Sequence, residues 1–572
     1  MPKHSNRWWI VPTLALGALA LFLATPDVDP DSEVEVTAPS VALGSSPQFA
    51  GGGADDKEPV PDLGWSPVMF TDDVQPHPIA MTDVPALDQS LQVNAVARPK
   101  SRPRATIPIP LEEANKLRLE ALGLPPSARV QQAVTLAGNG PVALDFDGPD
   151  MSEACDGCGT VPPDPELAVG DDHVIAVVNV AFAIYDKTGA ILPGYPKFFA
   201  DFFAGVPGCT GEFDPNVIYD EQVKRFVLGI DGGGTHYCVA ASATSDPTGA
   251  WNRYSFQTGD ANIFFDYPHA GIGIRAIYMG ANLFSNTTGG FLEGRIWAIN
   301  RRNLYLGQPL NVVSQSLGFD STPRPMNLHG FAQGTWPTSR IHYFLTDDQF
   351  NGATYGVWSW DFPFNGSGGI LNKDGVVDLV AATGVPAGFP IDAPQQGGAD
   401  IQANDWRVQD AEYRNGSLWM TNTISCNPGG GTVNCARWAQ IDPTGPSVIQ
   451  AGVFGSEGQH RIFADTAVNH CDTMIMGYSK TSTTTNPGVS IAGRLAATPP
   501  GQLAGERDVI AGQAVYSAFD PAPHRWGDYT GMTSDPNGKE FWYLGEYSKN
   551  ISFSLGNWGT RVAKVSLGCQ TP

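Results

Sequence analysis

HRWGDYTGMTSDPNGKEFWYLGEYSKN, residues 524–550, is the stretch that decides the fold. Its centre, Ser534-Asp535-Pro536-Asn537-Gly538, supplies a proline that fixes φ and then residues that tolerate positive φ, as a tight hairpin needs. We therefore expect one strand that ends at this turn and a second, aromatic strand around Phe541–Tyr547. The same unit recurs upstream and predicts the architecture of most of the chain.

The second strand of this unit recurs at intervals of roughly 50 to 75 residues. Each copy follows one strand-like segment and precedes another that carries a turn. The seven copies are HVIAVVN (173–179), RFVLGID (225–231), AIYMGAN (276–282), IHYFLTD (341–347), SLWMTNT (417–423), TMIMGYS (473–479) and EFWYLGE (540–546).

Repeats of three or four strands at this spacing are typical of a β-propeller. Blades pack face to face, which explains apolar runs that are nearly continuous. The last copy ends at Leu567 with three strands, and the segment at 132–147 has no blade of its own. We therefore predict an all-β propeller of seven four-stranded blades, with the last blade completed by a strand from the N-terminal side. The irregular stretch 361–402 leaves six or eight blades as alternatives.

The N-terminus predicts export. Lys3 and Arg7 precede an apolar run from Trp8 to Ala24, with a small-x-small sequence at 18–20. We expect a signal peptide over residues 1–24, with an uncleaved anchor as the alternative and no other membrane-spanning segment. The protein is then secreted, periplasmic or on the cell surface.

Residues 25–130 are predicted to form an acidic, proline-rich linker with little regular structure. The linker contains a short basic patch at 97–108 and one helix-like piece at 111–123, whose Leu111, Leu117, Leu119 and Leu122 lie roughly on one face. The propeller domain then covers 131–572. The net charge of −24 argues against nucleic acid as a partner, because polyanion binding needs clustered Lys and Arg.

The eight cysteines fit an oxidising compartment. Cys426 and Cys435 flank a turn and are expected to form a disulfide, as are Cys209 and Cys238, which bracket one repeat. Cys471 and Cys569 pair by elimination. Cys155 and Cys158 form a CxxC that we interpret as a local disulfide, with redox activity or metal binding as alternatives. Neither a second CxxC nor a His pair completes a zinc site.

Polar residues gather where the first strand of each predicted blade begins, near the central channel. Carboxylates, histidines and a tyrosine there could act as general acids or bases, and arginines could bind a ligand. The alternative is structural, because such groups also pair with one another and hold blades together. The catalytic candidates are Asp266, His269, His329, Asp410, Asp465, Asp528 and Tyr529; the ligand-binding candidates are Arg407, Arg461, His524 and Arg525; Asp164, Glu166 and Asp214 also lie at strand entrances.

We expect no cofactor and no metal. A weak alternative is calcium at Asn372-Lys373-Asp374-Gly375 with Asp378, where Ile370 stands at the first ligand position of the loop. Four tryptophans that look exposed could stack on sugar rings, although packing between blades is the simpler role for most of them: Trp251, Trp358, Trp360 and Trp406.

Several stretches resemble an uncharacterised family of secreted bacterial β-propeller proteins. The resemblance runs from about Pro163 to the C-terminus, and it implies the fold and secretion but no catalytic residues. The stretches are 214–229, 245–256, 266–284, 524–536, 541–547 and 557–567.

Three functions follow as hypotheses. The first is a secreted module that binds an extracellular glycan or protein through the central cup. The second is a polysaccharide-degrading hydrolase or lyase that uses the cup residues. The third is a structural protein of the envelope or matrix. A catalytic cup needs a solvent-facing group with a perturbed pKa, whereas a binding site does not.

Overall fold

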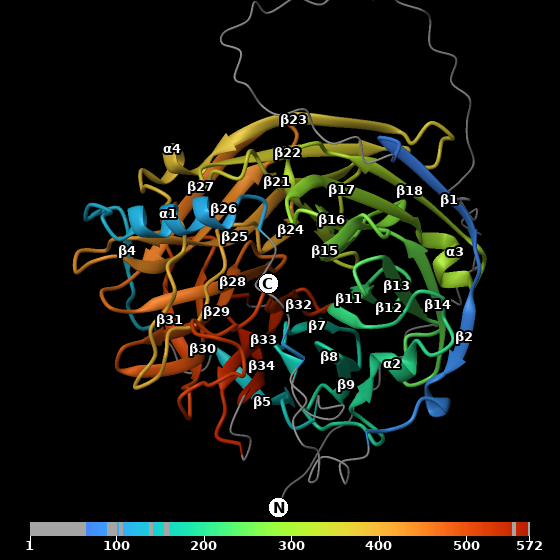
Figure 1. Ribbon diagram of the computed structural model, residues 1–572, viewed down its shortest axis with the longest axis horizontal. Helices are drawn as coiled ribbons and strands as arrows, with labels where there is room; N and C mark the ends of the chain where they lie inside the picture. Colours follow the sequence, from blue (N-terminus) through green and yellow to red (C-terminus); the bar gives the residue numbers. More distant parts are fainter. Residues whose placement is uncertain are drawn as a thin grey trace, which may run out of the picture. The chain divides into compact units, whose positions relative to one another are not determined.

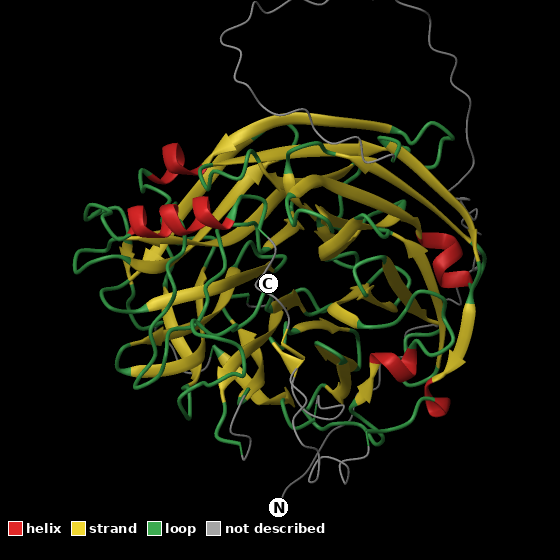
Figure 2. Ribbon diagram, viewed as in Figure 1, coloured by secondary structure: helices red, strands yellow, loops and turns green. Residues whose placement is uncertain are grey.

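The computed structural model describes residues 65–87, 100–101, 107–136, 141–153, 160–551 and 556–569, all within the compact unit Val60–Pro572. The predicted signal peptide and the pair Cys155 and Cys158 lie outside the described residues. Strands dominate the described chain, and its few helices lie at the periphery (Figure 2).

In the described residues, seven sheets of four to six strands follow one another, and their strands pair antiparallel except where β20 meets β24 and β27 meets β4. In Figure 1 strands β7, β11, β15, β24, β28 and β32 lie nearest the centre, and β1, β2 and β23 lie at the outside. This arrangement of sheets around a central channel is a β-propeller.

The first three sheets run from β7 to β18. The first contains β7 (Glu166–Val169), β8 (His173–Val178), β9 (Ala181–Asp186) and β10 (Lys197–Phe198). The second contains β11 (Glu212–Asp220), β12 (Arg225–Gly232), β13 (His236–Ser242), β14 (Ala250–Gln257) and β2 (His77–Ala80). The third contains β15 (Ile263–Ile272), β16 (Ala276–Ser285), β17 (Phe291–Asn300), β18 (Leu310–Ser316) and β1 (Val68–Val74).

The next three sheets continue to β31. The fourth contains β19 (Ser321–Pro325), β21 (His342–Asp347), β22 (Thr354–Asp361) and β23 (Ile370–Asp378). The fifth contains β20 (Asn327–Leu328), β24 (Asp410–Arg414), β25 (Ser417–Cys426), β26 (Val433–Asp442), β27 (Ser447–Gly455) and β4 (Gln131–Gln132). The sixth contains β28 (His460–Val468), β29 (Met474–Ser482), β30 (Thr485–Arg494) and β31 (Gly505–Ile510).

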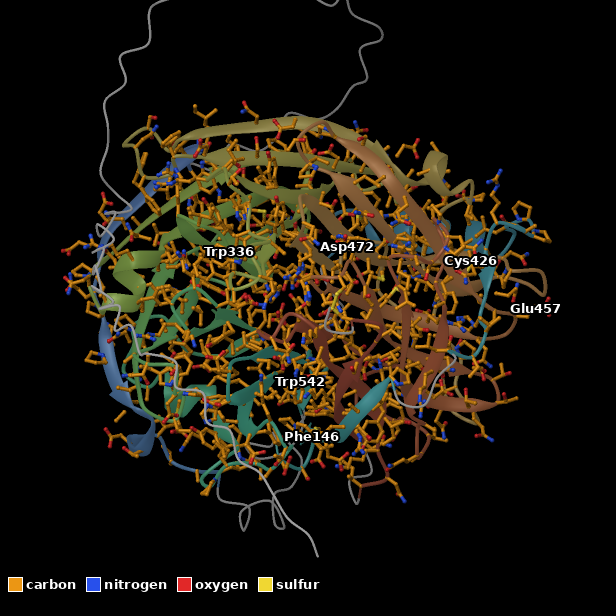
Figure 3. The ribbon with its side chains drawn as sticks, turned by 180° about the vertical axis from the view of Figure 1, so that it is seen from behind. Phe146, Trp336, Cys426, Glu457, Asp472 and Trp542 are labelled. Atoms are coloured by element: carbon orange, nitrogen blue, oxygen red, sulfur yellow. A yellow bond between two sulfur atoms is a disulfide. The ribbon has the colours of Figure 1, made fainter. Side chains whose placement is uncertain are left out.

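The seventh sheet joins the two ends of the propeller sequence. It contains β32 (Gly531–Ser534), β33 (Glu540–Ser548), β34 (Trp558–Ser566) and β5 (Val142–Asp150). β5 pairs antiparallel with β34, with Ala563 opposite Asp145, as the sequence predicted for the closing strand. Arg561 pairs with Asp145 and Asp147 across this seam. In Figure 3 Phe146 and Trp542 of this sheet lie near each other, and both pack in one apolar cluster.

The hairpin between β32 and β33 forms as predicted. The backbone N–H of Asp535 donates to the carbonyl of Glu540, and Gly538 adopts φ 75°, a conformation that glycine tolerates. The Asp535 carboxylate also accepts a hydrogen bond of 2.9 Å from the indole of Trp542. The turn residue thereby anchors the aromatic strand that follows.

Three strands, β1, β2 and the two-residue β3 (Lys100–Ser101), lie in the segment where we expected little regular structure. β1 pairs with β18 and β2 pairs with β14, so each adds a fifth strand to the outside of a sheet. Both strands are half-buried or exposed, and β1 contains Asp72 and Asp73, so neither shows a clean apolar alternation. A short 3-10 helix, Met81–Asp83, follows β2.

The expected helix is α1 (Leu111–Ala121), but it buries a different face. Ala114 and Ala121 are buried, and Leu117 packs against the apolar cluster that contains Ala114. Leu111, Leu119 and Leu122 are exposed. Ala114 packs in one apolar cluster with Cys426 and Cys435, so the helix lies close to the fifth sheet. The remaining helices are α2 (Phe199–Phe202), α3 (Arg301–Leu306) and α4 (Leu379–Thr383), and β3 (Lys100–Ser101) pairs with β6 (Thr160–Val161).

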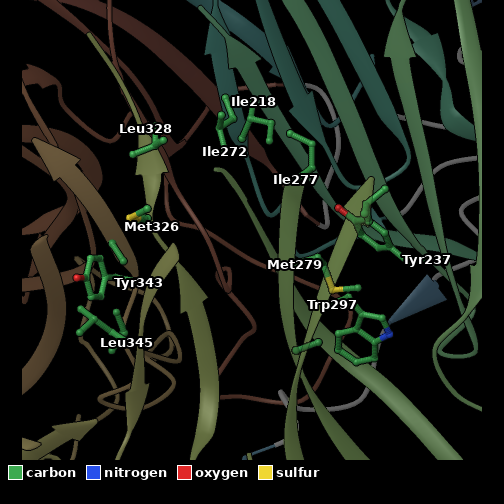
Figure 4. Packing of buried hydrophobic residues seen from close by; sticks show 14 of the residues in the cluster. Ile218, Tyr237, Ile272, Ile277, Met279, Trp297, Met326, Leu328, Tyr343 and Leu345 are labelled. Atoms are coloured by element: carbon green, nitrogen blue, oxygen red, sulfur yellow. The ribbon is translucent and has the colours of Figure 1, made fainter. Parts of the chain in front are cut away.

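The core lies between neighbouring sheets rather than in one central mass. Figure 4 shows one such layer, in which Ile218 of β11, Ile272 of β15 and Ile277 of β16 face one another. All seven predicted apolar segments are second strands of the sheets, and β25 is buried at every position. The tryptophans follow the same rule, because Trp251, Trp360 and Trp406 are at most 3% exposed and cannot offer a stacking surface.

In the described part of the chain, three disulfides join Cys209 to Cys238, Cys426 to Cys435 and Cys471 to Cys569, which confirms these predicted pairs. Such bonds persist in oxidising compartments. Within the part of the chain that the structure describes, no helix is long and apolar enough to span a membrane.

Candidate functional site

The channel has a distinctive local structure at the end where the inner strands begin. Several residues there adopt positive φ, and four of them precede a proline: Asp164 (48°), Asp214 (50°), Tyr267 (62°) and Thr322 (50°). The register of β11, β15 and β19 shifts at these points, which marks bulges. Non-glycine residues with positive φ are uncommon and concentrate at functional positions. We call this end of the channel the mouth.

Hydrogen bonds connect the residues of the mouth across several sheets. The backbone N–H of Asp528 donates to Asp164 Oδ1 at 2.6 Å, and Tyr529 Oη donates to Asp214 Oδ2 at 2.9 Å. Asn404 Nδ2 donates to the carbonyl of Gly527 at 3.0 Å and also to the Asp528 carboxylate. The candidates Asp528 and Tyr529 are therefore both members of a buried network.

Two arginines of the mouth are each paired. Arg525 forms a bidentate pair with Asp528, with one contact at 3.1 Å. Arg407 pairs with Asp405 and lies 4.1 Å above the ring of Tyr267. Both guanidinium groups are buried, so neither extends into solvent towards a ligand.

Aromatic rings pack beside these arginines. Tyr267 and Tyr529 stack with centroids 4.7 Å apart, and His269 meets both rings edge-on. His269 is 2% exposed, and its Nε2 has no hydrogen-bond partner among the described residues. Asp266 lies next to this group and is half-buried.

The middle of the channel is narrow and charged. Arg324 Nη2 lies 3.2 Å from Asp410 Oδ1, and the space between the strands has a volume of about 20 Å³. Burial raises the pKa values of both Asp465 and Asp410, and the neighbouring Asp410 raises that of Asp465 further. Burial also raises the pKa of Glu166 to about 7, against the opposing charge of Arg324. A space this small excludes a sugar ring.

The far end of the channel holds His329. Its ring nitrogens lie 3.3 Å from Glu221 Oε1 and 3.2 Å from Glu412 Oε1. Burial alone would lower the pKa of His329, but the two carboxylates outweigh it and raise the pKa to about 9. Glu221, His329 and Glu412 therefore form a buried ionic group. We use the term far end for the part of the channel that contains these three residues.

Two further candidates lie away from the channel interior. Arg461 pairs with Glu506 of the outer strand β31. His524 Nδ1 contacts the carbonyl of Asp520 at 3.0 Å, in the irregular segment that precedes the mouth. Among the described residues, neither Arg461 nor His524 has a side-chain hydrogen bond to a carboxylate of the channel.

The segment that matches part of a calcium loop is a strand. Residues 372–375 belong to β23, and Lys373 Nζ pairs with Asp320 and Asp348. Asp378 accepts a hydrogen bond from the backbone N–H of Ala381 and so caps α4. Lys373 and Asp378 are therefore occupied by structural contacts.

Two groups of side chains bring potential metal ligands within 4.8 Å of one another among the described residues. In the first, Cys471 and Cys569 accompany His470, but their disulfide leaves no thiolate for a metal. The second consists of Asp164, Asp214 and Asp528 at the mouth.

A pocket of about 670 Å³ opens beside the mouth. Its walls come from the chain before and within α1, the β16–β17 hairpin, the segment before β19 and the connection between α4 and β24. The lining residues are Ile107, Pro108, Ile109, Pro110, Leu111, Arg118, Thr288, Gly289, Gly290, Phe291, Phe319, Asp392, Gln402 and Asn404.

Asn404 connects the pocket to the mouth. Its side chain donates to Asp528, and its backbone carbonyl accepts a hydrogen bond of 3.2 Å from Arg118. Phe319 is 54% exposed and presents an aromatic face at the rim. The sequence analysis missed this pocket because residues 385–409 show no strand period and Phe319 lies in irregular chain before β19.

Comparisons with known proteins give no family. No family model matches the chain, and no curated protein matches it. Solved structures with a similar arrangement include the phage phi92 endosialidase, at 9% identity and a TM-score of 0.34, covering 76% of this chain and 69% of that one. They also include the Penicillium chrysogenum α-L-arabinanase with arabinobiose (9%, TM-score 0.31, 74% and 98%) and the SapL1 lectin with α-methyl fucoside (11%, TM-score 0.30, 62% and 97%). Similarity this low carries no argument about function.

Proposed function

We propose that this propeller binds an extracellular glycan in the pocket beside the mouth. The observation that carries the proposal is the pocket itself, whose volume of about 670 Å³ lies within the range of about 300–1,000 Å³ usual for ligand sites. The three disulfides support an oxidising compartment, where extracellular glycans occur.

The chemistry of the walls suits a sugar. Phe291, Phe319 and the prolines offer apolar faces, against which the C–H face of a pyranose can pack. Asp392 and Gln402 lie among these faces and offer polar atoms for the hydroxyl edge, whereas the side chain of Asn404 is already hydrogen-bonded to Asp528, Gly527 and Arg525. A few polar groups within an apolar lining are what a specific ligand site requires.

Binding without cleavage fits the pocket better than hydrolysis. Asp392 is the one carboxylate among the described residues that line it, whereas glycoside hydrolysis generally uses two flanking carboxylates, about 5–9.5 Å apart. The channel carboxylates Asp410 and Asp465 are at most 8% exposed and border a space of about 20 Å³. They are therefore too enclosed to meet a sugar.

The test measures binding of the purified protein to a panel of polysaccharides and oligosaccharides by calorimetry, together with product release. We expect binding without turnover, and we expect Phe319→Ala to weaken it about tenfold, the equivalent of about 1.4 kcal/mol. Phe331→Ala is the matched control, because Phe331 is 43% exposed and does not line the pocket. Equal affinity in both variants, or reducing ends that appear with time, would contradict the proposal.

A further inference from the structure

Three carboxylates from three different sheets meet at the mouth. Asp164 precedes β7, Asp214 lies in β11, and Asp528 precedes β32, so they join the first, second and seventh sheets. One oxygen of each lies within 4.8 Å of the others. The three residues are 1%, 4% and 6% exposed, so water contributes little to their solvation.

The hydrogen-bond donors to these carboxylates include neutral groups, and one arginine, Arg525, is close enough to attract all three carboxylates. Asn179 Nδ2 donates to Asp164 at 2.5 Å, Tyr529 donates to Asp214, and Arg525 pairs with Asp528. The neighbouring Arg407 pairs with Asp405. Buried carboxylates that lie together need compensating positive charge, because burial of an ion is costly unless it is paired or coordinates a metal.

Glu546 adds a separate observation. It is 1% exposed, and its Oε1 has no hydrogen-bond partner in the described part of the chain. A Cβ placed on Gly527 would lie 3.3 Å from Glu546 Oε2 and 3.7 Å from Asp164 Oδ1. Glu546 and Asp164 therefore face the same point of the backbone, directly before Asp528, where glycine leaves room.

We propose that Asp164, Asp214 and Asp528 bind a divalent cation with the ligand preferences of Ca²⁺, and that Glu546 supports the site from the side of Gly527. Hard cations take oxygen ligands, and Ca²⁺ takes them at about 2.3–2.6 Å in variable geometry. Two oxygens at about 2.4 Å from one ion lie at most about 4.8 Å apart, and the oxygens of the three carboxylates lie within 4.8 Å of one another. Because all the ligands are oxygens, the site does not suit metals that prefer sulfur or nitrogen.

The position of the ion gives it a role in holding the ring together. β5 and β34 close the seventh sheet, and the ion joins that sheet to the first and second sheets across the junction. This role is separate from glycan binding in the pocket, although Asn404 contacts both regions.

The first experiment uses the wild-type protein. After dialysis against a chelator, Ca²⁺, Mg²⁺ or buffer is added, and we measure bound metal by elemental analysis and the unfolding temperature. We expect one Ca²⁺ per chain and a higher unfolding temperature with Ca²⁺ than with chelator. No stoichiometric ion and identical unfolding in Ca²⁺ and chelator would overturn the proposal, and preference for Mg²⁺ would overturn the assignment to Ca²⁺.

The second experiment locates the ion. Tb³⁺ replaces Ca²⁺, and its luminescence is excited through Tyr529, whose hydroxyl bonds to Asp214. We expect Asp214→Asn to weaken Tb³⁺ and Ca²⁺ binding at least tenfold. Asp465→Asn is the matched control, a buried channel carboxylate outside the cluster, and should bind as the wild type does. Equal loss in both variants, or none in Asp214→Asn, would place the ion elsewhere and overturn the proposal.

Discussion

The mouth and the far end of the channel bury carboxylates in different ways. At the far end, His329 lies between Glu221 and Glu412, and its raised pKa of about 9 keeps it positively charged at neutral pH. At the mouth, Asp164, Asp214 and Asp528 converge, and a single arginine, Arg525, pairs with Asp528 and attracts the other two carboxylates. The chain's own cation balances the far end, whereas we propose that a bound ion balances the mouth.

The two ends of the channel also differ in their expected roles, one in stability and the other in ligand binding. The far end is a buried ionic group of the chain itself, and the middle has room for about one water molecule. The pocket opens beside the mouth, where Asn404 contacts both. We therefore expect variants of the far end to change stability and variants near the pocket to change binding.

The largest expected effect tests the charge balance of the mouth. Arg525→Met should lower the free energy of unfolding by about 3–5 kcal/mol in chelator, because it leaves Asp528 buried without its partner. Added Ca²⁺ should recover part of this loss. Urea unfolding with and without Ca²⁺ measures both. Arg507→Met, in an exposed arginine of β31, is the control and should change stability by less than about 0.5 kcal/mol.

If Arg525→Met and Arg507→Met lose the same small amount of stability, the Asp528 carboxylate is not held as a buried ion. The distinction between the two ends would then fail.

The second prediction concerns a covalent link that lies outside the mouth. The Cys471–Cys569 disulfide joins the turn between β28 and β29 to the chain after β34, across 98 residues. The double variant Cys471→Ser/Cys569→Ser should lose about 2–4 kcal/mol of unfolding free energy. The loss should be the same with Ca²⁺ as with chelator, because distant sites add independently. A loss that Ca²⁺ removes would show that the two regions are coupled.

The smallest of the expected changes in stability concerns His329 at the far end. Because the folded-state pKa of His329 is raised above its unfolded value, its stabilisation is full below about pH 6.5 and is lost as the pH rises through about 9. His329→Gln should lower the unfolding free energy by about 1–3 kcal/mol at pH 6.5 and should flatten the decline between pH 6.5 and 9. Thermal unfolding across this range measures the difference.

His173→Gln is the control for His329→Gln. His173 lies half-buried at the start of β8, outside the channel, and its replacement should leave the pH dependence of the wild type intact. An unchanged profile in His329→Gln would mean that His329 is not charged between its two glutamates.

The sequence predicted the elements that carry a strong local signal. The apolar second strands are buried on both faces, so their residue types alone identify them, as in β25 and β33. β5 could be assigned to the last sheet because the repeat count left both without a partner. β1 and β2 were missed because outer strands keep one side in solvent and need no apolar pattern.

The sequence predicted individual residues of the site but not that they come together. Asp164, Asp214 and Asp528 each stand at a predicted strand entrance, but Asp164 and Asp528 are 364 residues apart, and no local pattern shows that they meet. Glu546 lies in the apolar run of β33 and gave no sign of a polar role. Phe319, Gln402 and Asn404 come from irregular chain, where position depends on tertiary contacts alone.

An anomalous difference map from crystals grown with Ca²⁺ or Tb³⁺ tests the contrast between the two ends most directly. We predict one strong peak between the carboxylates of Asp164, Asp214 and Asp528 and none between Glu221 and Glu412, where His329 supplies the charge. No peak at the mouth, or a peak at the far end, would contradict the account.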